Sequence, residues 1–116
     1  MKYTVRLKKN KTLKYILKNG RYSTNKHLVV HTTENRNKNK NYFAVCVSKK
    51  NGISVHRNKL KRWARECYKF EEDTLKRGYN IVILYKKSAN ISNLSFEIVQ
   101  KEIKNCLKEL GLYEKN

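Results

Sequence analysis

The chain has 116 residues, a length that predicts one domain over 1–116 with a modest hydrophobic core. Lysine and arginine number 28 against nine acidic residues, and the net charge of +19 predicts a polyanionic partner, with nucleic acid as the main candidate. No apolar run reaches about 18 residues and the N-terminus lacks a signal-peptide core, so we expect a cytoplasmic protein with no membrane partner.

The first half of the chain predicts one helix followed by strands. Residues 1–8 are basic and extended, and a stripe of Leu13, Ile16 and Leu17 predicts a helix over 9–19 that ends at Gly20. We next expect a short edge strand over 21–24, followed by two strands rich in β-branched residues over 27–33 and 42–48. We expect those two strands to pair as an antiparallel hairpin, because only a polar connector separates them.

The second half predicts two helices with one strand between them. A charged helix is expected from about 56 to 70, and the nearly continuous apolar run 80–85 predicts an interior strand covered on both faces. Apolar residues at spacings of three and four predict a helix over 95–110. The fold class is therefore α+β, with the order helix, three strands, helix, strand and helix around one mixed sheet.

The charged helix divides into two faces when its residues are placed at about 100° intervals. Its apolar face holds Leu60, Trp63, Ala64, Cys67 and Phe70. Its polar face holds Asn58, Lys61, Arg62, Arg65 and Lys69, with Arg57 at the edge. Like charges at i,i+4 destabilise a helix, so a stripe of one sign indicates that a polyanion neutralises it.

The sequence contains many groups that bind phosphates and few that would cleave them. Cys46, Cys67 and Cys106 lie too far apart for a metal-ligand motif, and we expect buried thiols rather than disulfides. The few carboxylates are too scattered to hold catalytic metals, so we predict no metal site and no catalytic residue. One alternative stays open, in which His27 and His31 share a strand face as a general acid–base pair of a nuclease.

Residues 47–65 carry a specific pattern, V-S-K-K-x-G-x-S-V-x-R-N-x-x-K-R-x-x-R, which resembles the motif of the bacterial ribonuclease P protein subunit. Upstream, R-L-K-K at 6–9, the apolar stripe of the first helix and Gly20 are similar to the first helix of that family. The order of predicted elements matches the family along nearly the whole chain.

The resemblance implies a small α/β sandwich of the ribosomal-protein type, with a left-handed crossover through the basic helix. It implies a subunit of an endoribonuclease in which a catalytic RNA removes the 5′ leader of precursor tRNA, while the protein alone is not catalytic. The implied partners are this RNA and precursor tRNA, with no protein partner. Mg²⁺ would serve the holoenzyme, and the protein alone would bind no cofactor. The alternative is a ribosomal or RNA-chaperone protein with no role in cleavage.

The resemblance also implies which residues meet RNA. The expected RNA-binding residues are Lys49, Lys50, Arg57, Asn58, Lys61, Arg62, Arg65 and Lys69, although Asn58 is equally suited to capping the helix. The expected leader cleft lies between the first helix and the sheet, with Leu13, Leu17, His31 and Phe43 as candidates. The family usually has aromatic residues at positions 13 and 17. Two alternatives follow for this chain: leader binding is weaker, or stacking uses His31, Tyr15 or Phe43 instead. Both leucines would serve equally well as core.

Overall fold

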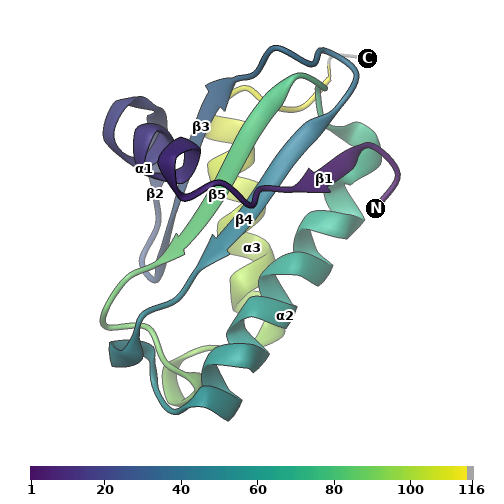
Figure 1. The fold of residues 1–116 in the computed structure, drawn as a ribbon. Helices are drawn as coiled ribbons and strands as arrows, with labels where there is room; N and C mark the ends of the chain where they lie inside the picture. Colours follow the sequence, from purple (N-terminus) through teal and green to yellow (C-terminus); the bar gives the residue numbers. More distant parts are fainter. Residues whose placement is uncertain (115–116) are drawn as a thin grey trace.

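The computed structural model describes residues 1–114, which form a five-stranded mixed sheet in the order β1-β4-β5-β3-β2 (Figure 1). The strands are β1 (Thr4–Arg6), β2 (Arg21–Thr24), β3 (Leu28–Glu34), β4 (Asn41–Cys46) and β5 (Tyr79–Tyr85). The helices are α1 (Asn10–Asn19), α2 (Ser54–Glu71) and α3 (Phe96–Glu109). Three 3₁₀ turns complete the set, η1 (Lys49–Asn51), η2 (Glu72–Thr74) and η3 (Ile91–Asn93). The predicted α+β class is confirmed.

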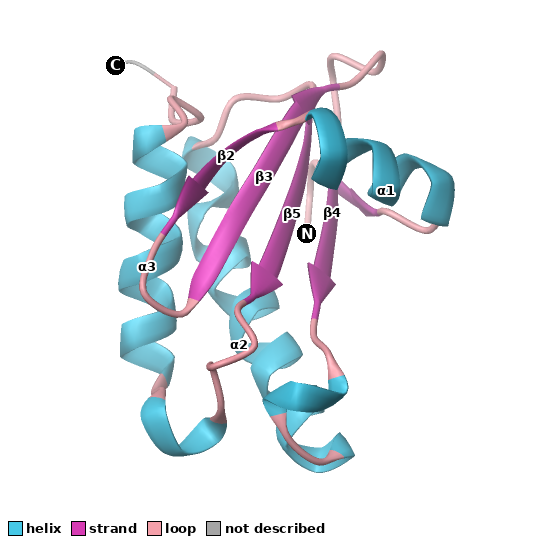
Figure 2. Cartoon of the chain, turned by 90° about the vertical axis from the view of Figure 1, so that its left-hand side faces the viewer, coloured by secondary structure: helices cyan, strands magenta, loops and turns pink. Residues whose placement is uncertain are grey.

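The helices lie on both faces of the sheet in three layers (Figure 2). The short helix α1 crosses one face, and α2 and α3 cover the other. In Figure 1, β4 and β5 run downwards side by side with β4 on the right, and α2 joins them behind the sheet, so this crossover is left-handed. Such crossovers are rare between parallel strands, and the family resemblance implied this one. None of the helices in residues 1–114 has the length and apolar character needed to span a membrane.

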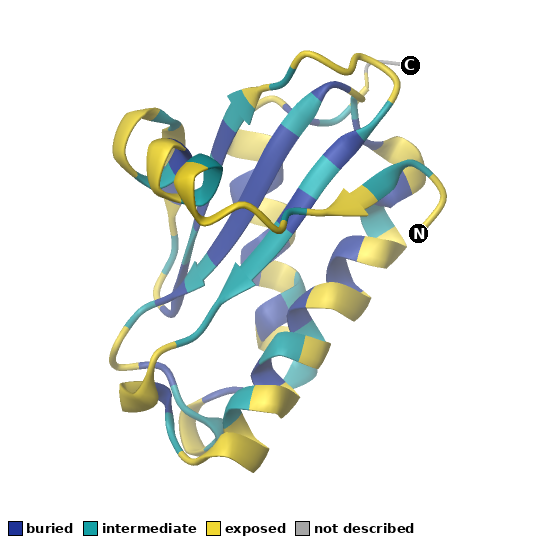
Figure 3. Cartoon of the chain, in the orientation of Figure 1, coloured by how far each residue is buried: buried dark blue, intermediate teal, exposed yellow. Residues whose placement is uncertain are grey.

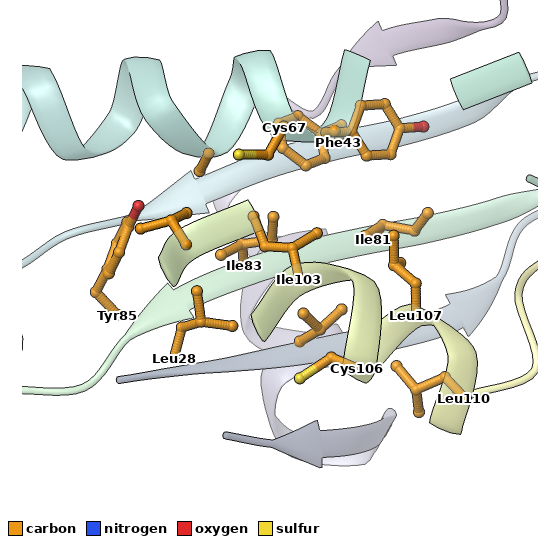
Figure 4. Packing of buried hydrophobic residues seen from close by; sticks show 14 of the residues in the cluster. Leu28, Phe43, Cys67, Ile81, Ile83, Tyr85, Ile103, Cys106, Leu107 and Leu110 are labelled. Atoms are coloured by element: carbon orange, nitrogen blue, oxygen red, sulfur yellow. The ribbon is translucent and has the colours of Figure 1, made fainter. Parts of the chain in front are cut away.

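The hydrophobic core fills the space between the sheet and the helix pair α2–α3 (Figure 4). Leu28, Ile81 and Ile83 of the sheet pack in one cluster with Leu60 of α2 and Ile103 of α3, and all five are at most 1% exposed. Burying one such side chain stabilises the fold by about 1.5–3 kcal/mol. The predicted interior strand is confirmed, because β5 is central and its middle residues are buried from both sides.

The predicted hairpin between the two β-branched strands is wrong. β5 lies between them, antiparallel to β3 from Leu28↔Tyr85 to Glu34↔Tyr79 and parallel to β4 from Tyr42↔Asn80 to Cys46↔Leu84. The reason is burial: β5 is the most continuously apolar strand, and a central place covers both of its faces. Proximity of β3 and β4 in the sequence therefore does not determine which strands pair in the sheet.

The strand β1 was not predicted within the extended N-terminal segment. It pairs in parallel with β4, from Thr4↔Asn41 to Arg6↔Phe43. The buried Glu72 fixes the chain just before it, accepting hydrogen bonds from the backbone N–H of Lys2 at 2.7 Å and of Tyr3 at 3.1 Å. Burial by itself would raise the pKa of Glu72. Hydrogen bonding by the Thr4 side chain and by these backbone donors, together with the charge of the N-terminal amino group, outweighs it and lowers the pKa below its ordinary value. The strand thus depends on tertiary contacts with the end of α2.

Two details of the helices differ from the prediction. Phe70 is 69% exposed, and the residue that fills the corresponding part of the core is Tyr68, which is fully buried and stacked on Phe43. The last contact of α2 with the sheet is made by Tyr68, two residues before Phe70, because Phe43 of β4 lies against the Tyr68 ring. Gly20 does follow α1, but its φ of −73° is not left-handed. It is needed for close approach, since a Cβ there would stand 2.6 Å from the carbonyl oxygen of Ile16.

Candidate nucleic-acid interface

α2 presents a continuous row of cations to solvent. Its buried side carries Leu60, Ala64 and Cys67, all with no exposed surface, which fixes the rotation of the helix on the sheet. The other side carries what we call the α2 basic stripe, namely Lys61, Arg62, Arg65 and Lys69. Arg62, Arg65 and Lys69 are exposed and Lys61 is half-buried. Figure 3 shows exposed and buried segments alternating along α2.

The cations of this stripe have no carboxylate partner among residues 1–114. The two ion pairs in the described part of the chain join His27 to Glu102 and Lys104 to Glu71, and neither involves the stripe. Repulsion between neighbouring cations on a helix costs a few tenths of a kcal/mol for each pair. The arrangement therefore favours binding of a polyanion, as the sequence predicted.

Two cations of the stripe, Lys61 and Arg65, converge with Arg6 between α2 and the edge of the sheet. A cavity of about 270 Å³ lies there, lined by Arg6, Lys61 and Arg65 together with Leu13 of α1 and the segment 43–46 of β4. Its floor is a free strand edge, because the pairing of β4 with β1 ends at Phe43. Burial raises the pKa of the Cys46 thiol despite the nearby Lys61, so the thiol is neutral at pH 7 and the charge of the cavity stays positive.

The motif residues Arg57 and Asn58 occupy the second turn of α2. Arg57 is half-buried, and its Nη2 donates to Ser54 Oγ at 3.0 Å while its buried Nε lacks a partner among the described residues. Asn58 is exposed and does not cap α2, because the helix begins at Ser54 and Ile53 is its N-cap residue. The capping alternative is therefore wrong, and the Asn58 amide is available for a partner.

A row of lysines lines the end of the sheet at which β4 and β5 finish. The buried Asn51 holds this end together, since its Nδ2 donates at 2.8 Å to the carbonyl oxygens of Lys86 and Ala89. The backbone N–H of Lys86 donates in turn to the His27 carbonyl at 2.9 Å. These bonds bring together what we call the lysine rim, namely Lys26, Lys49, Lys50, Lys86 and Lys87.

Three members of the rim, Lys26, Lys86 and Lys87, were missed by the sequence analysis. A signal was present, because a pair of lysines follows each of the strands β4 and β5 within a few residues. Parallel neighbours end at the same edge of a sheet, so the two pairs meet. The signal was unusable without knowing that β4 and β5 are neighbours.

The sheet face on the α1 side is only partly covered. Half-exposed side chains remain beside α1, and these are Val29, His31, Leu84 and Cys46. Leu13 and Leu17 of α1 are half-buried, so each side chain is partly packed in the protein and partly accessible to solvent. Tyr15 of α1 is 60% exposed. The expected cleft between the first helix and the sheet thus has three of its four candidates within reach of solvent.

The fourth cleft candidate, Phe43, is a correction. Its ring belongs to the core, is 4% exposed and stacks on Tyr68 with centroids 4.2 Å apart. Strand alternation places it on the face opposite α1, since its neighbours Tyr42 and Ala44 point toward α1. Phe43 therefore has no ring surface for stacking on a nucleic-acid base.

The hypothesis of a paired-histidine nuclease is also wrong. His27 precedes β3, and its buried ring bonds to Glu102 of α3 with 2.5 Å between Nδ1 and Oε2. His31 lies on the other face, half-buried, where desolvation lowers its pKa. Residues 1–114 also contain no group of three or more His, Cys, Asp or Glu side chains placed to hold a metal ion. The geometry supports binding of phosphates and bases.

The fold and these surfaces define a class, a small basic α+β protein whose surface is suited to binding nucleic acid. The model of the ribonuclease P family matches residues 1–111. The protein component of ribonuclease P from Clostridium botulinum strain 657 is 37% identical over 109 residues, which are 93% of this chain and 96% of the relative. Its counterpart from Clostridium kluyveri is 37% identical over 111 residues, or 94% of this chain and 96% of the relative.

Solved structures agree with the sequence matches. The ribonuclease P protein of Staphylococcus aureus has a TM-score of 0.78 and 28% identity, covering 94% of this chain and 97% of that one. The protein from Thermotoga maritima has a TM-score of 0.75 and 26% identity, covering 87% and 93%. The chain belongs to the ribonuclease P protein family, and its function is that of a protein subunit of this ribonucleoprotein enzyme. The resemblance noted in the sequence is confirmed, and its partner is the ribonuclease P RNA.

Proposed function

We propose that the α2 basic stripe, together with Arg57 and Asn58, binds the catalytic RNA, and that the open sheet face beside α1 receives the 5′ leader of precursor tRNA. In this proposal the protein assists endonucleolytic removal of the leader in the cytoplasm. The observation that carries the proposal is the unneutralised stripe on α2, which includes Lys61, Arg62 and Arg65 of the motif by which the sequence resembles the family.

The chemistry of the stripe suits a folded RNA backbone. Guanidinium groups offer planar, bidentate contacts to phosphate oxygens, so Arg62 and Arg65 would fix the orientation of the subunit on the RNA. Such contacts release counterions and carry little sequence information. Lys49 and Lys50 of the lysine rim continue the positive surface from the start of α2 to the open sheet face, where the leader would lie.

The side-chain groups of the proposed interface indicate which tasks belong to the protein and which to the RNA. Mg²⁺ prefers oxygen ligands, mainly carboxylates and phosphates, whereas the proposed interface consists of ammonium, guanidinium and amide groups. The protein side chains would therefore repel a divalent cation, and we place the Mg²⁺ of the holoenzyme on the RNA. The protein supplies binding and orientation, and it lowers the concentration of Mg²⁺ needed to screen the phosphates of RNA and substrate.

Reconstitution tests the proposal. The purified protein is mixed with ribonuclease P RNA and precursor tRNA at limiting Mg²⁺, and the release of the 5′ leader is measured. We expect cleavage by the RNA to be stimulated by the protein, and no cleavage by the protein alone. Binding of both RNAs without any stimulation would instead favour the ribosomal or chaperone alternative. Cleavage by the protein in the absence of the RNA would contradict the proposal.

A further inference from the structure

One large aromatic side chain of α2 lies in solvent. Phe70 is 69% exposed, although Cys67 and Tyr68 just before it are fully buried. The ring lines a surface hollow of about 400 Å³ together with Glu66 and Lys69. A single exposed ring is common on protein surfaces, so the groups around the hollow decide what it can bind.

The hollow is continuous with the α2 basic stripe. Glu66, Lys69 and Phe70 have the spacing i, i+3 and i+4, which places them on one side of the helix. Lys69 is the last member of the stripe, and Arg62 and Arg65 lie one turn before Glu66 and Lys69. An RNA that covers the stripe therefore extends over the hollow.

The Glu66 carboxylate restricts what enters the hollow. It is exposed among cations and belongs to neither ion pair of residues 1–114. A phosphate in the hollow would be repelled by this charge, whereas a base brings hydrogen-bond donors that a carboxylate accepts. Guanine suits it best, because its N1–H and N2–H₂ donors lie side by side and match two carboxylate oxygens. The other three bases each place an acceptor next to the donor on this edge, which the carboxylate would repel.

We infer that Glu66, Lys69 and Phe70 bind one unpaired guanine of the ribonuclease P RNA, an inference that rests on the proposed function of the α2 basic stripe. The base stacks on the Phe70 ring, Glu66 accepts from its Watson–Crick edge, and Lys69 neutralises the adjacent phosphate. The ring of Trp63, one turn before Glu66, is half-buried and covered by Lys59, whose Nζ lies 5.3 Å from the ring centroid. Phosphate contacts carry little sequence information, so the guanine site fixes the position of α2 along the RNA.

The first test removes the ring. Phe70→Leu keeps an apolar side chain without a π-face, and Phe70→Tyr keeps the ring. Tyr22→Leu is the control, because Tyr22 is 64% exposed and lies on the edge strand β2. Binding of labelled ribonuclease P RNA to each protein is measured by titration. We expect Phe70→Leu to weaken binding by about 5-fold or more, while Phe70→Tyr and Tyr22→Leu retain wild-type affinity.

The second test uses the charge of Glu66, because phosphate and guanine contacts predict changes of opposite sign. Glu66→Gln removes a negative charge, so binding would become tighter if only phosphates lay against this turn of α2. With a guanine bound there, the variant loses one acceptor and the charge of the other, and we expect binding to weaken by about 3-fold or more.

The guanine itself is identified with RNAs in which unpaired guanines are replaced one at a time by inosine, which lacks the N2 amino group. One replacement should weaken binding to the wild type and have less effect on Glu66→Gln, as direct contact between the two groups requires. If every inosine substitution has the same effect on both proteins, Glu66 does not contact a guanine and the inference is wrong.

The outcomes for the guanine site and for the proposed function are separate. Wild-type affinity in Phe70→Leu, an equal loss in Tyr22→Leu, or tighter or unchanged binding in Glu66→Gln would overturn the inference. The proposed function fails if Arg62→Gln with Arg65→Gln also binds this RNA with the affinity and salt dependence of the wild type. If that double variant binds more weakly while Phe70→Leu does not, the stripe binds RNA and only the guanine site is wrong.

Discussion

Removing two arginines from the α2 basic stripe should change how RNA binding depends on salt. The variant is Arg62→Gln with Arg65→Gln, at positions that are exposed and form no ion pair in the described chain. Because neither side chain supports the core, the fold should persist, and the thermal melting midpoint should stay close to that of the wild type. Loss of two phosphate contacts is then the main effect.

The magnitude follows from counterion release. Each phosphate contact contributes about 0.7 to 0.9 to the slope of log Kobs against log salt concentration, so the double variant should lose about 1.4 to 1.8 in slope. Between about 50 and about 200 mM salt, the variant would lose roughly 7- to 12-fold less affinity than the wild type does. At low salt the variant should bind more weakly, because two favourable contacts are missing.

The assay is a titration of labelled ribonuclease P RNA with protein at several salt concentrations. Lys101→Gln with Lys108→Gln is the matched control, since both lysines are exposed on α3 and the same net charge is removed. The control should retain the wild-type slope. An unchanged slope in the arginine variant, or an equal change in the control, would refute the assignment of α2 as the RNA-binding helix.

Two further predictions concern stability. Glu72→Gln should destabilise the fold by about 1–2 kcal/mol at neutral pH, because the backbone donors of Lys2 and Tyr3 lose a charged acceptor. The folded-state pKa of Glu72 lies below its ordinary value of 4.5, so wild-type stability from this carboxylate is complete above that value and is lost as the pH falls through the folded pKa. Urea denaturation of both proteins should show the difference shrinking in acid, and a difference that is constant with pH would contradict this role. Gly20→Ala should destabilise by about 1–3 kcal/mol, since the added Cβ would meet the carbonyl oxygens of Ile16 at 2.6 Å and Thr32 at 2.8 Å. A thermal melt checks it, and an unchanged midpoint would show that α1 can move away from β3 at little cost.

Local patterns explain which parts of the site could be predicted. The spacing of Leu60, Ala64 and Cys67 fixed the buried side of α2, and that side determines where Arg62, Arg65 and Lys69 point. Phe70 and Tyr68 show the limit of such spacing, because the sheet beneath the last turn of α2 selected Tyr68 for burial. Periodicity predicts which residues face inward along a helix, but not where the supporting layer ends.

Strand order required information that no local pattern contains. β3 and β4 are neighbours in sequence and were expected to pair, yet β5 separates them. The consequences reach the site: Lys49 and Lys50 meet Lys86 and Lys87 only because β4 and β5 run parallel as neighbours. Similarly, His27 and His31 have the spacing of one strand face, but the Glu102 carboxylate of α3 draws the His27 ring to the other side.

By itself, the sequence determined the class of the fold, the family and the cation stripe on α2, because composition, helical periodicity and a linear motif are properties of neighbouring residues. Only the tertiary structure decided the central place of β5, the lysine rim, the burial of Phe43 and the exposure of Phe70. Each of these depends on which distant segments share the buried faces of the sheet. The free energy of packing the whole chain determines which segments share these faces, and it cannot be calculated from any single segment.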